Sequence, residues 1–318
     1  MTTVLVCSGG GHLKQLSRLV PRMGLDDDLV WVTFETGLSQ SLLAGQDVVF
    51  VDYTRPRDYA GVAKLSVKAE QLVRQRHVGR VISTGANLAL SFLPSVLLRG
   101  REFHYIESAA RADGPSATGK VMMRTPRVHR YAQYPWFDSR KWSHVGSVFD
   151  GFVPSDVGVA RPLRRVVVTA GTTDSYGFRR LFERTASLLP ASAEVLWQVG
   201  SSDVSGLGLR DPRATVPTEE LAQAIAEADL VITHAGAGSA LTALEAGHFP
   251  IMVPREASHG EHVDDHQQQV ARELHKRGLA LHVSVETLDA DALLDAAGRR
   301  VEVVSNPPAF PLKGVRTQ

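Results

Sequence analysis

The chain has 318 residues, of which 43% are hydrophobic, so it exceeds the usual size of one core and we expect two α/β domains. Its 35 basic and 34 acidic residues nearly cancel, which excludes a broad electrostatic surface for nucleic acid. The single cysteine, Cys7, excludes an internal disulfide framework, and its place at the end of an apolar run favours a small buried hydrophobe.

The sequence gives no sign of a secretion signal or of a membrane span. The chain enters an apolar strand at once, without a charged leader region or a cleavage site, so we expect it in the cytoplasm. No apolar run reaches the ~20 residues that a membrane span needs. The nearest candidate, residues 88–98, contains Pro94 and is predicted to be a helix that is buried or lies against a surface.

In the first half of the chain, predicted strands alternate with predicted helices. The strands are expected at residues 4–6, 29–34, 48–51 and 81–82. Apolar residues at helical spacing begin at Leu13 and again at Val62, and each set predicts a helix between two of these strands. Such alternation implies a parallel sheet, and ligands bind such sheets at the carboxyl ends of the strands. We therefore expect His12, Gly85 and the loop after residue 106 to meet at this edge.

The second half repeats this alternation after an irregular segment. Residues 151–165 contain Gly, Pro and Asp without periodicity, and we predict a linker there. It separates a first domain at residues 1–150 from a second at residues 166–300, and a tail follows at residues 301–318. Within the second domain, strands are expected at residues 166–169, 195–197, 230–232 and 251–253.

A glycine-rich loop, HAGAGS at residues 234–239, leads into a predicted helix that begins near Ser239. Gly236 and Gly238 let the backbone approach a ligand, and the amino end of the helix favours an anion such as a phosphate. Close packing alone is the other explanation for such a loop. Neither a Lys-Ser or Lys-Thr pair nor a G-x-G-x-x-G pattern occurs here, which disfavours nucleotide hydrolysis and dinucleotide redox chemistry.

Seven motifs in order along the chain resemble those of GT-B glycosyltransferases. They are SGGGH at 8–12, ISTGA at 82–86, YIES at 105–108 followed by Arg111, YPW at 134–136 leading to VGS, VTAGTT at 168–173, HAGAGS at 234–239 and EHVDDHQ at 261–267. More narrowly, the chain resembles a fusion of the two eukaryotic subunits that add the second N-acetylglucosamine to dolichol diphosphate. Bacterial exopolysaccharide glycosyltransferases with a family 28 C-terminal domain show the same arrangement. The resemblance implies two Rossmann-like domains that face each other across a cleft.

The resemblance also implies a division of labour between the domains. The second would bind a UDP-sugar through Gly171, Thr172, Thr173, His234, Ala235, Gly236, Ala237, Gly238, Ser239, Glu245, Asp265, His266 and Gln267. The first would bind the acceptor through Gly10, Gly11, Thr84, Gly85 and Arg111. Relatives often carry an acidic residue for the ribose at the position of Thr242, and Glu245 is the candidate substitute. Backbone N–H groups and hydroxyls would hold the diphosphate without a metal or other cofactor.

Transfer requires a base that removes the proton of the attacking hydroxyl. His12 is the first candidate, because an imidazole with a pKa near 6.5 is neutral at working pH. Its alternative roles are to cap its helix or to hold the acceptor's diphosphate. Glu107 is the second candidate, since a carboxylate at the end of a strand can act as a base. The arrangement implies attack opposite the leaving group, and hence inversion.

The histidines of EHVDDHQ also suggest a metal site, because His262 and His266 lie one helical turn apart. The H-E-x-x-H order is missing, and Asp264 and Asp265 equally suit the first turn of a helix, so we predict no metal. Arg255 follows a strand and is positioned to meet a sugar carboxylate. This adds UDP-glucuronic acid to UDP-glucose and UDP-N-acetylglucosamine as expected donors.

The expected acceptor is a polyprenyl-diphosphate-linked saccharide in polysaccharide biosynthesis. Contact with the membrane surface would come from the helix at residues 88–98 and from a basic stretch, Arg99, Arg101, Lys120, Arg124, Arg127 and Arg130. A solvated face is the alternative for that stretch. Three other functions stay open: a natural-product glycosyltransferase with a soluble aglycone, a nucleotide-sugar epimerase and a non-catalytic nucleotide-sugar-binding protein.

Overall fold

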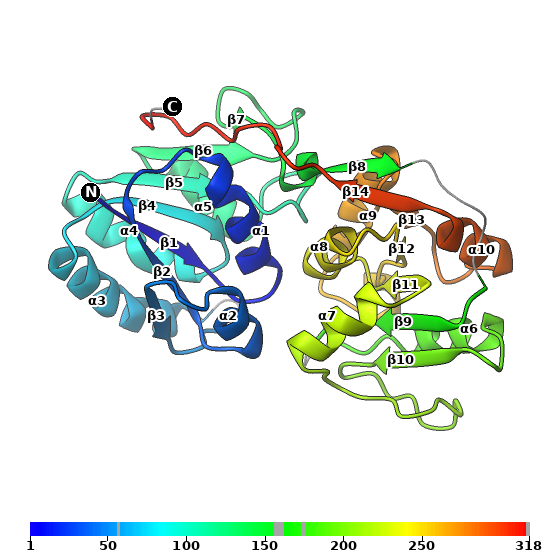
Figure 1. The fold of residues 1–318 in the computed structure, drawn as a ribbon. Coiled ribbons are helices and arrows are strands. Elements are labelled where there is room, and N and C mark those ends of the chain that lie inside the picture. Colours follow the sequence, from blue (N-terminus) through cyan, green and yellow to red (C-terminus); the bar gives the residue numbers. More distant parts are fainter. Residues whose placement is uncertain (56–57, 156–161, 173–175, 316–318) are drawn as a thin grey trace. The chain divides into compact units, whose positions relative to one another are not determined.

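The computed structural model describes residues 1–55, 58–155, 162–172 and 176–315 (Figure 1). The chain divides into two compact units. Unit 1 comprises Met1–Asp150 together with Pro307–Gln318, and unit 2 comprises Gly151–Asn306. Each unit has its own sheet and helices, and each is described by itself.

Unit 1 is built on a seven-stranded parallel sheet with the order β3-β2-β1-β4-β5-β6-β7. Its strands are β1 (Thr2–Cys7), β2 (Asp28–Phe34), β3 (Val48–Val51), β4 (Val78–Gly85), β5 (Glu102–Ile106), β6 (Val128–Ala132) and β7 (Ser143–His144). Four consecutive residues of β1, from Val4 to Cys7, are fully buried, as expected for a central strand covered on both faces. The strand order reverses at β1 and β4, and in open α/β sheets ligands bind outside the carboxyl ends of the strands at such a reversal.

The helices of unit 1 cover this sheet. They are α1 (Gly11–Leu19), η1 (Val20–Arg22), α2 (Gly37–Leu42), α3 (Tyr59–Gln75), α4 (Leu88–Leu98), α5 (Ala117–Arg124) and η2 (Val148–Gly151). The predicted helix at residues 88–98 is confirmed as α4, which contacts α3, β1 and β4. Leu88, Phe92 and Val96 of α4 are buried in the core, whereas Leu98 is exposed. Most apolar side chains of α4 therefore face the protein and are not available for the predicted membrane contact.

Unit 2 contains a five-stranded parallel sheet with the order β10-β9-β11-β12-β13. The strands are β9 (Arg165–Thr169), β10 (Glu194–Gln198), β11 (Leu230–Thr233), β12 (Ile251–Met252) and β13 (Leu281–His282). The helices are α6 (Arg179–Leu188), α7 (Thr218–Ala226), α8 (Ala237–Glu245), η3 (Ala257–His259), α9 (His266–Lys276) and α10 (Ala290–Gly298). The loops after β9 and β11 meet because these strands are adjacent and parallel.

The segment predicted as a linker is divided differently in the structure. Its first residues form β8 (Phe152–Ser155), which pairs antiparallel with β14 (Arg300–Val303). This two-stranded sheet belongs to unit 2. Sequence periodicity did not predict the pair because β8 is short, and its Pro154 disfavours a central strand.

The predicted tail at residues 301–318 is also divided, because β14 belongs to unit 2 whereas the residues from Pro307 belong to unit 1. Within unit 1, the N–H of Phe310 donates to the carbonyl of Arg22 at 2.7 Å, and Nε of Arg22 donates to the carbonyl of Pro308 at 2.8 Å. The side chains of Phe310 and Leu312 are buried. Residues 308–312 therefore contribute to the core of unit 1.

The described helices were also compared with the length and hydropathy that a membrane span requires. None of those in the described ranges is both long and apolar enough to cross a bilayer.

Candidate functional site

The amino end of α1 lies at the strand-order reversal of unit 1. Gly10 precedes the helix with φ of 64°, a left-handed conformation that glycine adopts without strain. Among the described residues, no side chain caps this helix, and its first turn contains no acidic residue. The first backbone N–H groups and the positive end of the helix dipole can therefore serve an anion.

His12 lies in the first turn of α1 and is half-buried. Its Nδ1 is 2.8 Å from the carbonyl oxygen of Thr84, and Oγ1 of Thr84 donates to the carbonyl of His12 at 2.9 Å. Because a carbonyl only accepts, Nδ1 carries the proton of the neutral ring and Nε2 carries the lone pair. The structure thus places His12 beside Thr84, next to Gly85 where it was expected, with the tautomer that a base acting through Nε2 requires.

Gly85 makes room for this histidine. Its φ is 112°, and a Cβ at this position would lie 3.3 Å from Cε1 of His12 and 3.1 Å from the hydroxyl of Tyr105. The absence of a side chain at Gly85 is therefore explained by packing around the His12 ring.

Glu107 is a buried carboxylate held by several hydrogen bonds. It is 1% exposed and accepts hydrogen bonds from the N–H of Ser116 at 3.0 Å, from the N–H of Ser108 at 3.2 Å and from the hydroxyl of Tyr105 at 3.2 Å. Burial raises the pKa of Glu107, and the hydrogen bonds from Ser116 oppose this rise. The geometry favours a carboxylate that positions the loop before α5 over the predicted role in proton transfer.

Two buried amides that sequence reasoning missed hold the same loop. Oε1 of Gln15 accepts from the N–H of Ala109 at 2.8 Å and from Nε2 of Gln133 at 3.0 Å. Nε2 of Gln15 donates to Oγ of Ser108 at 3.1 Å. These bonds fix the backbone just before Arg111, which is half-buried. The sequence signal for Gln15 was its place between Leu13 and Leu16 on the apolar side of α1, where a buried amide needs hydrogen-bond partners.

In unit 2, the imidazole of His234 lies between two glycines. A Cβ at Gly171 would lie 2.7 Å from Cε1 of His234, and one at Gly236 would lie 2.4 Å from its Nε2. Nδ1 of His234 is 3.3 Å from the carbonyl of Thr169, which places the proton on Nδ1. Burial, and then the nearby Arg255, lower the pKa of His234 to about 3, so the ring is neutral. The glycines thus accommodate a side chain of the protein itself.

The helix after this loop begins two residues earlier than predicted, at Ala237, with Gly236 as its N-cap residue. Within the described chain no side chain caps α8, and its first turn has no acidic residue. Ala237, Gly238 and Ser239 therefore present backbone N–H groups at the positive end of the helix.

Glu245 is not near that loop. It is the exposed last residue of α8, and a rise of 1.5 Å per residue places its Cα about 12 Å along the helix from Ala237. Oγ1 of Thr242, the other position considered for the ribose, donates to the carbonyl of Gly238 at 3.0 Å. The use of Glu245 for the ribose therefore stays a prediction.

Arg255 is buried rather than presented to a sugar. It is 1% exposed, and Nη2 donates to the carbonyl of Ala170 at 2.7 Å. Its backbone N–H donates to Oε1 of Gln267 at 3.0 Å, and its guanidinium lies 5.7 Å from the centre of the Phe178 ring. Burial lowers the pKa of Arg255 to about 10. The prediction that Arg255 meets a sugar carboxylate is corrected, because this side chain and Gln267 support the loop from within.

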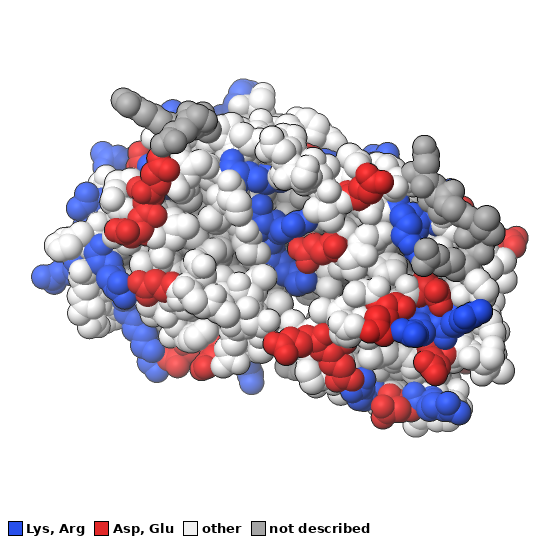
Figure 2. Space-filling model, viewed as in Figure 1, with Lys and Arg blue, Asp and Glu red and all other residues white. Residues whose placement is uncertain are grey.

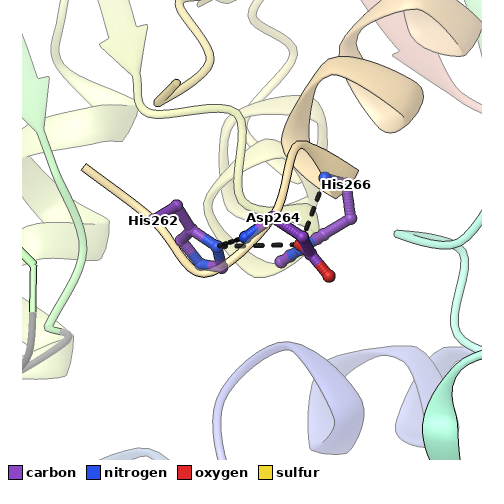
Figure 3. A group of neighbouring side chains, drawn as sticks. All are labelled: His262, Asp264 and His266. Carbon is purple, nitrogen blue, oxygen red and sulfur yellow. Dashed lines mark hydrogen bonds and ion pairs between the residues drawn. The ribbon is translucent and has the colours of Figure 1, made fainter. Parts of the chain in front are cut away.

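The segment from His262 to His266 brings two imidazoles and a carboxylate together (Figure 3). Nδ1 of His266 is paired with Oδ1 of Asp264, and the two imidazole centres are 4.6 Å apart. Burial, followed by the charge of His266, lowers the pKa of His262 to about 4. The predicted donor residue Asp265 accepts from the N–H of Ala257 at 2.9 Å and so supports the loop.

Arg180 of α6 anchors this loop from another element. Its Nε and Nη2 donate to the two carboxylate oxygens of Glu261 at 2.9 and 3.0 Å. Its Nη1 donates to Glu286 at 2.6 Å, and Glu256 lies 3.8 Å away. This bidentate pair fixes the backbone that leads into His262.

The remaining predicted residues are simply located. Thr172 is exposed after β9, and Thr173 lies outside the described residues.

Figure 2 shows basic and acidic side chains interspersed on the face in view, in keeping with a formal net charge of +1. Within the predicted basic stretch, Arg99 is paired with Glu70, and Nε of Arg130 donates to the carbonyl of Lys141 at 2.8 Å.

Residues 165–298 match the profile of the Glycosyltransferase family 28 C-terminal domain. The chain is similar to a UDP-N-acetylglucosamine--N-acetylmuramyl-(pentapeptide) pyrophosphoryl-undecaprenol N-acetylglucosamine transferase of Cupriavidus necator, with 31% identity over 41% of this chain and 37% of the relative. It is also similar to the UDP-N-acetylglucosamine transferase subunit ALG13 of Mus musculus, with 30% identity over 41% of this chain and 12% of the relative. The matched region thus spans well under half the length of these relatives.

Solved structures resemble nearly the whole chain. MurG of Acinetobacter baumannii has a TM-score of 0.57 at 21% identity, covering 93% of this chain and 89% of that chain. UDP-GlcNAc 2-epimerase of Methanocaldococcus jannaschii, in complex with UDP-GlcNAc and UDP, has a TM-score of 0.58 at 10% identity, covering 99% and 97%. The predicted α/β class with two Rossmann-like domains of the GT-B type is confirmed. The narrower resemblance to a fusion of the eukaryotic subunits stays a prediction.

Proposed function

We propose that the protein is a glycosyltransferase that moves a sugar from a UDP-sugar bound by unit 2 to a hydroxyl of an acceptor bound by unit 1. The observation that carries this proposal is the amino end of α8, which no described side chain caps, beside Gly171 and within the segment that matches the family 28 profile. Backbone N–H groups at a helix amino end bind phosphate oxygens well.

The donor's diphosphate would rest on the N–H groups of Ala237, Gly238 and Ser239. His234 contributes shape but no charge, since its pKa of about 3 keeps the ring neutral. Arg255 lies beneath the loop after β9 and adds a fixed positive charge close by. Such fixed donors stabilise a leaving diphosphate without a metal, so we propose a metal-independent reaction.

The acceptor's reacting hydroxyl would approach His12. Nε2 of His12 takes the proton while the acceptor oxygen forms a bond to the anomeric carbon and the bond to UDP breaks. Attack opposite the leaving group inverts the anomeric centre. The hydrogen bond from Nδ1 to Thr84 holds the ring in the required tautomer and supports this assignment over a helix-capping role.

For the acceptor we propose a polyprenyl-diphosphate-linked saccharide, used in polysaccharide biosynthesis at the cytoplasmic face of the membrane. The uncapped amino end of α1, with Gly10 and Gly11, offers a second anion site for its diphosphate. The Cupriavidus relative is named for a pyrophosphoryl-undecaprenol substrate and for UDP-N-acetylglucosamine, which makes that nucleotide sugar the first donor to test. A soluble aglycone remains the alternative acceptor.

A thermal-shift panel of UDP-, GDP- and dTDP-sugars tests the donor, because a ligand that binds only the folded protein raises its apparent stability. We expect stabilisation by UDP-N-acetylglucosamine or another UDP-hexose. A polyprenyl diphosphate N-acetylglucosamine in detergent should then trigger UDP release. Conversion of the UDP-sugar into its epimer without an acceptor would favour a nucleotide-sugar epimerase, an enzyme class whose fold the chain shares. UDP binding without turnover of either kind would favour a non-catalytic binding protein.

A further inference from the structure

Three potential metal ligands gather where the loop after η3 enters α9. His262, Asp264 and His266 alternate along the chain, and their side chains converge in Figure 3. One ligand atom from each residue lies within 4.8 Å of the other two. Sequence analysis considered His262 and His266 as metal ligands but predicted no metal because the H-E-x-x-H order is missing. The geometry of the group depends on the turn that precedes α9.

The spacing of these atoms is close to that of a coordinated ion. Nδ1 of His262 is 3.8 Å from Oδ1 of Asp264, and His266 already contacts the same oxygen. In a tetrahedral zinc site with bonds of roughly 2.1 Å, ligand atoms are about 3.4 Å apart. Small side-chain rotations would therefore close the group around an ion and replace the hydrogen bonds that these atoms now make.

The surroundings hold the ligands in place. The ring of His262 stacks on Tyr176 with centres 5.5 Å apart, and Arg180 fixes the preceding Glu261. Asp265 ties the start of α9 to Ala257. The side chains of His262, Asp264 and His266 are 16%, 41% and 20% exposed, so an ion can enter from solvent.

The donor atoms select the class of ion. Two imidazole nitrogens and one carboxylate oxygen suit a divalent transition metal such as Zn²⁺ and are a poor set for Ca²⁺ or Mg²⁺, which prefer oxygen ligands. The positive end of α9 and Arg255 oppose a cation, whereas Asp264 and Asp265 favour it. We propose that His262, Asp264 and His266 form a binding site for a divalent transition metal ion, with a coordination position left for water.

Occupancy of this site would interfere with the donor. This step rests on the proposed function, together with the donor-sugar contact of His266 that the resemblance implies. A bound ion would draw His266 away from the sugar, so Zn²⁺ is expected to weaken UDP-sugar binding instead of assisting transfer.

Titration of the full chain with Co²⁺ at neutral pH, followed by the visible absorption of the bound ion and by displacement with Zn²⁺, tests the site. We expect one ion per chain. His262→Ala and His266→Ala should each weaken binding by about tenfold or more, as Asp264→Asn should. His259→Ala is the matched control, because this exposed neighbour lies outside the group and should bind the ion normally.

Circular dichroism must show that each variant is folded, and Asp264→Asn keeps the side-chain size if an alanine variant fails. Unchanged Co²⁺ binding in folded Asp264→Asn and His266→Ala would overturn the metal site. UDP-sugar binding is measured separately on chelator-treated protein. No binding there would refute the proposed donor and leave the metal site intact.

Discussion

A Cβ on Gly236 would lie 2.4 Å from Nε2 of His234, a distance at which one of the two groups must move. The backbone at Gly236, with φ of −73° and ψ of 134°, is open to any residue. The requirement for glycine therefore comes from the histidine ring and not from the chain conformation. A side chain can therefore be added at Gly236 to test its contact with His234 without straining the backbone.

Gly236→Ala is expected to displace the His234 ring, lower the free energy of unfolding by about 1–3 kcal/mol and weaken UDP binding. Denaturant unfolding and calorimetric titration with UDP measure the two effects. In Gly236→Ala/His234→Ala the clash is gone, so the double variant should be more stable than the sum of the single effects predicts. Additive losses would show that the contact is unimportant.

His12→Gln should reduce turnover by about 10²–10⁴-fold, because the variant retains a polar side chain but has no group to accept the proton. Its affinity for UDP should stay close to that of the wild type, since the donor residues belong to unit 2. Steady-state rates of UDP release with acceptor measure the loss. His144→Gln, an exposed histidine of the same unit, serves as the control. Equal rates for both variants would exclude His12 as the base.

The buried His234 makes stability depend on pH. Its pKa in the folded protein is about 3, below the ordinary 6.5, so below pH 6.5 the unfolded chain binds a proton that the folded chain does not. Stability is therefore unaffected above pH 6.5 and is lost as pH falls from 6.5 towards 3.

At pH 5 this loss amounts to about 2 kcal/mol. His234→Asn removes the group, so between pH 7.5 and pH 5 the variant should lose less stability than the wild type by that amount. Urea unfolding at the two pH values measures the difference. Parallel pH profiles for the two proteins would contradict the assignment of a neutral buried His234.

Phe310 tests the role of the last residues in unit 1. Its side chain is fully buried and its ring lies 6.2 Å from that of Tyr131. Phe310→Ala should lower the free energy of unfolding of unit 1 by about 3–5 kcal/mol. Phe50→Ala, at a position 39% exposed, is the matched control and should cost much less. Similar losses in thermal unfolding would mean that Phe310 is not part of the core.

Most regular elements could be predicted because each is marked by its own residues. The apolar runs of β1, β2, β9 and β11 and the stripes of α1 and α3 depend only on local periodicity. The short pair β8 and β14 could not be predicted in this way, since its partners lie about 150 residues apart and stabilise each other only after the chain has folded. The glycine-rich loop around Gly236 was evident from the sequence, but the first residue of α8 was not.

The candidate site, too, could be predicted from the sequence only in part. Glycine-rich turns at strand ends located His12, Gly85 and Gly236 from the sequence. Their contacts were hidden, because the packing of His234 between Gly171 and Gly236 arises from two adjacent strands. The burial of Arg255 and Glu107 was equally hidden, since each follows a strand and either could have pointed to solvent. Only tertiary packing decides between these orientations.

Arg22 contacts unit 1 both just before the chain leaves for unit 2 and just after it returns. Its Nη2 lies 3.8 Å from Asp150, the last residue before unit 2, and its Nε donates to Pro308, just after the chain returns. Unit 2 is in effect an insertion into unit 1. A fragment of unit 1 that ends at residue 150 would lack Phe310 and Leu312. A short linker that joins Asp150 directly to Pro307 would instead give unit 1 with these two buried residues in place.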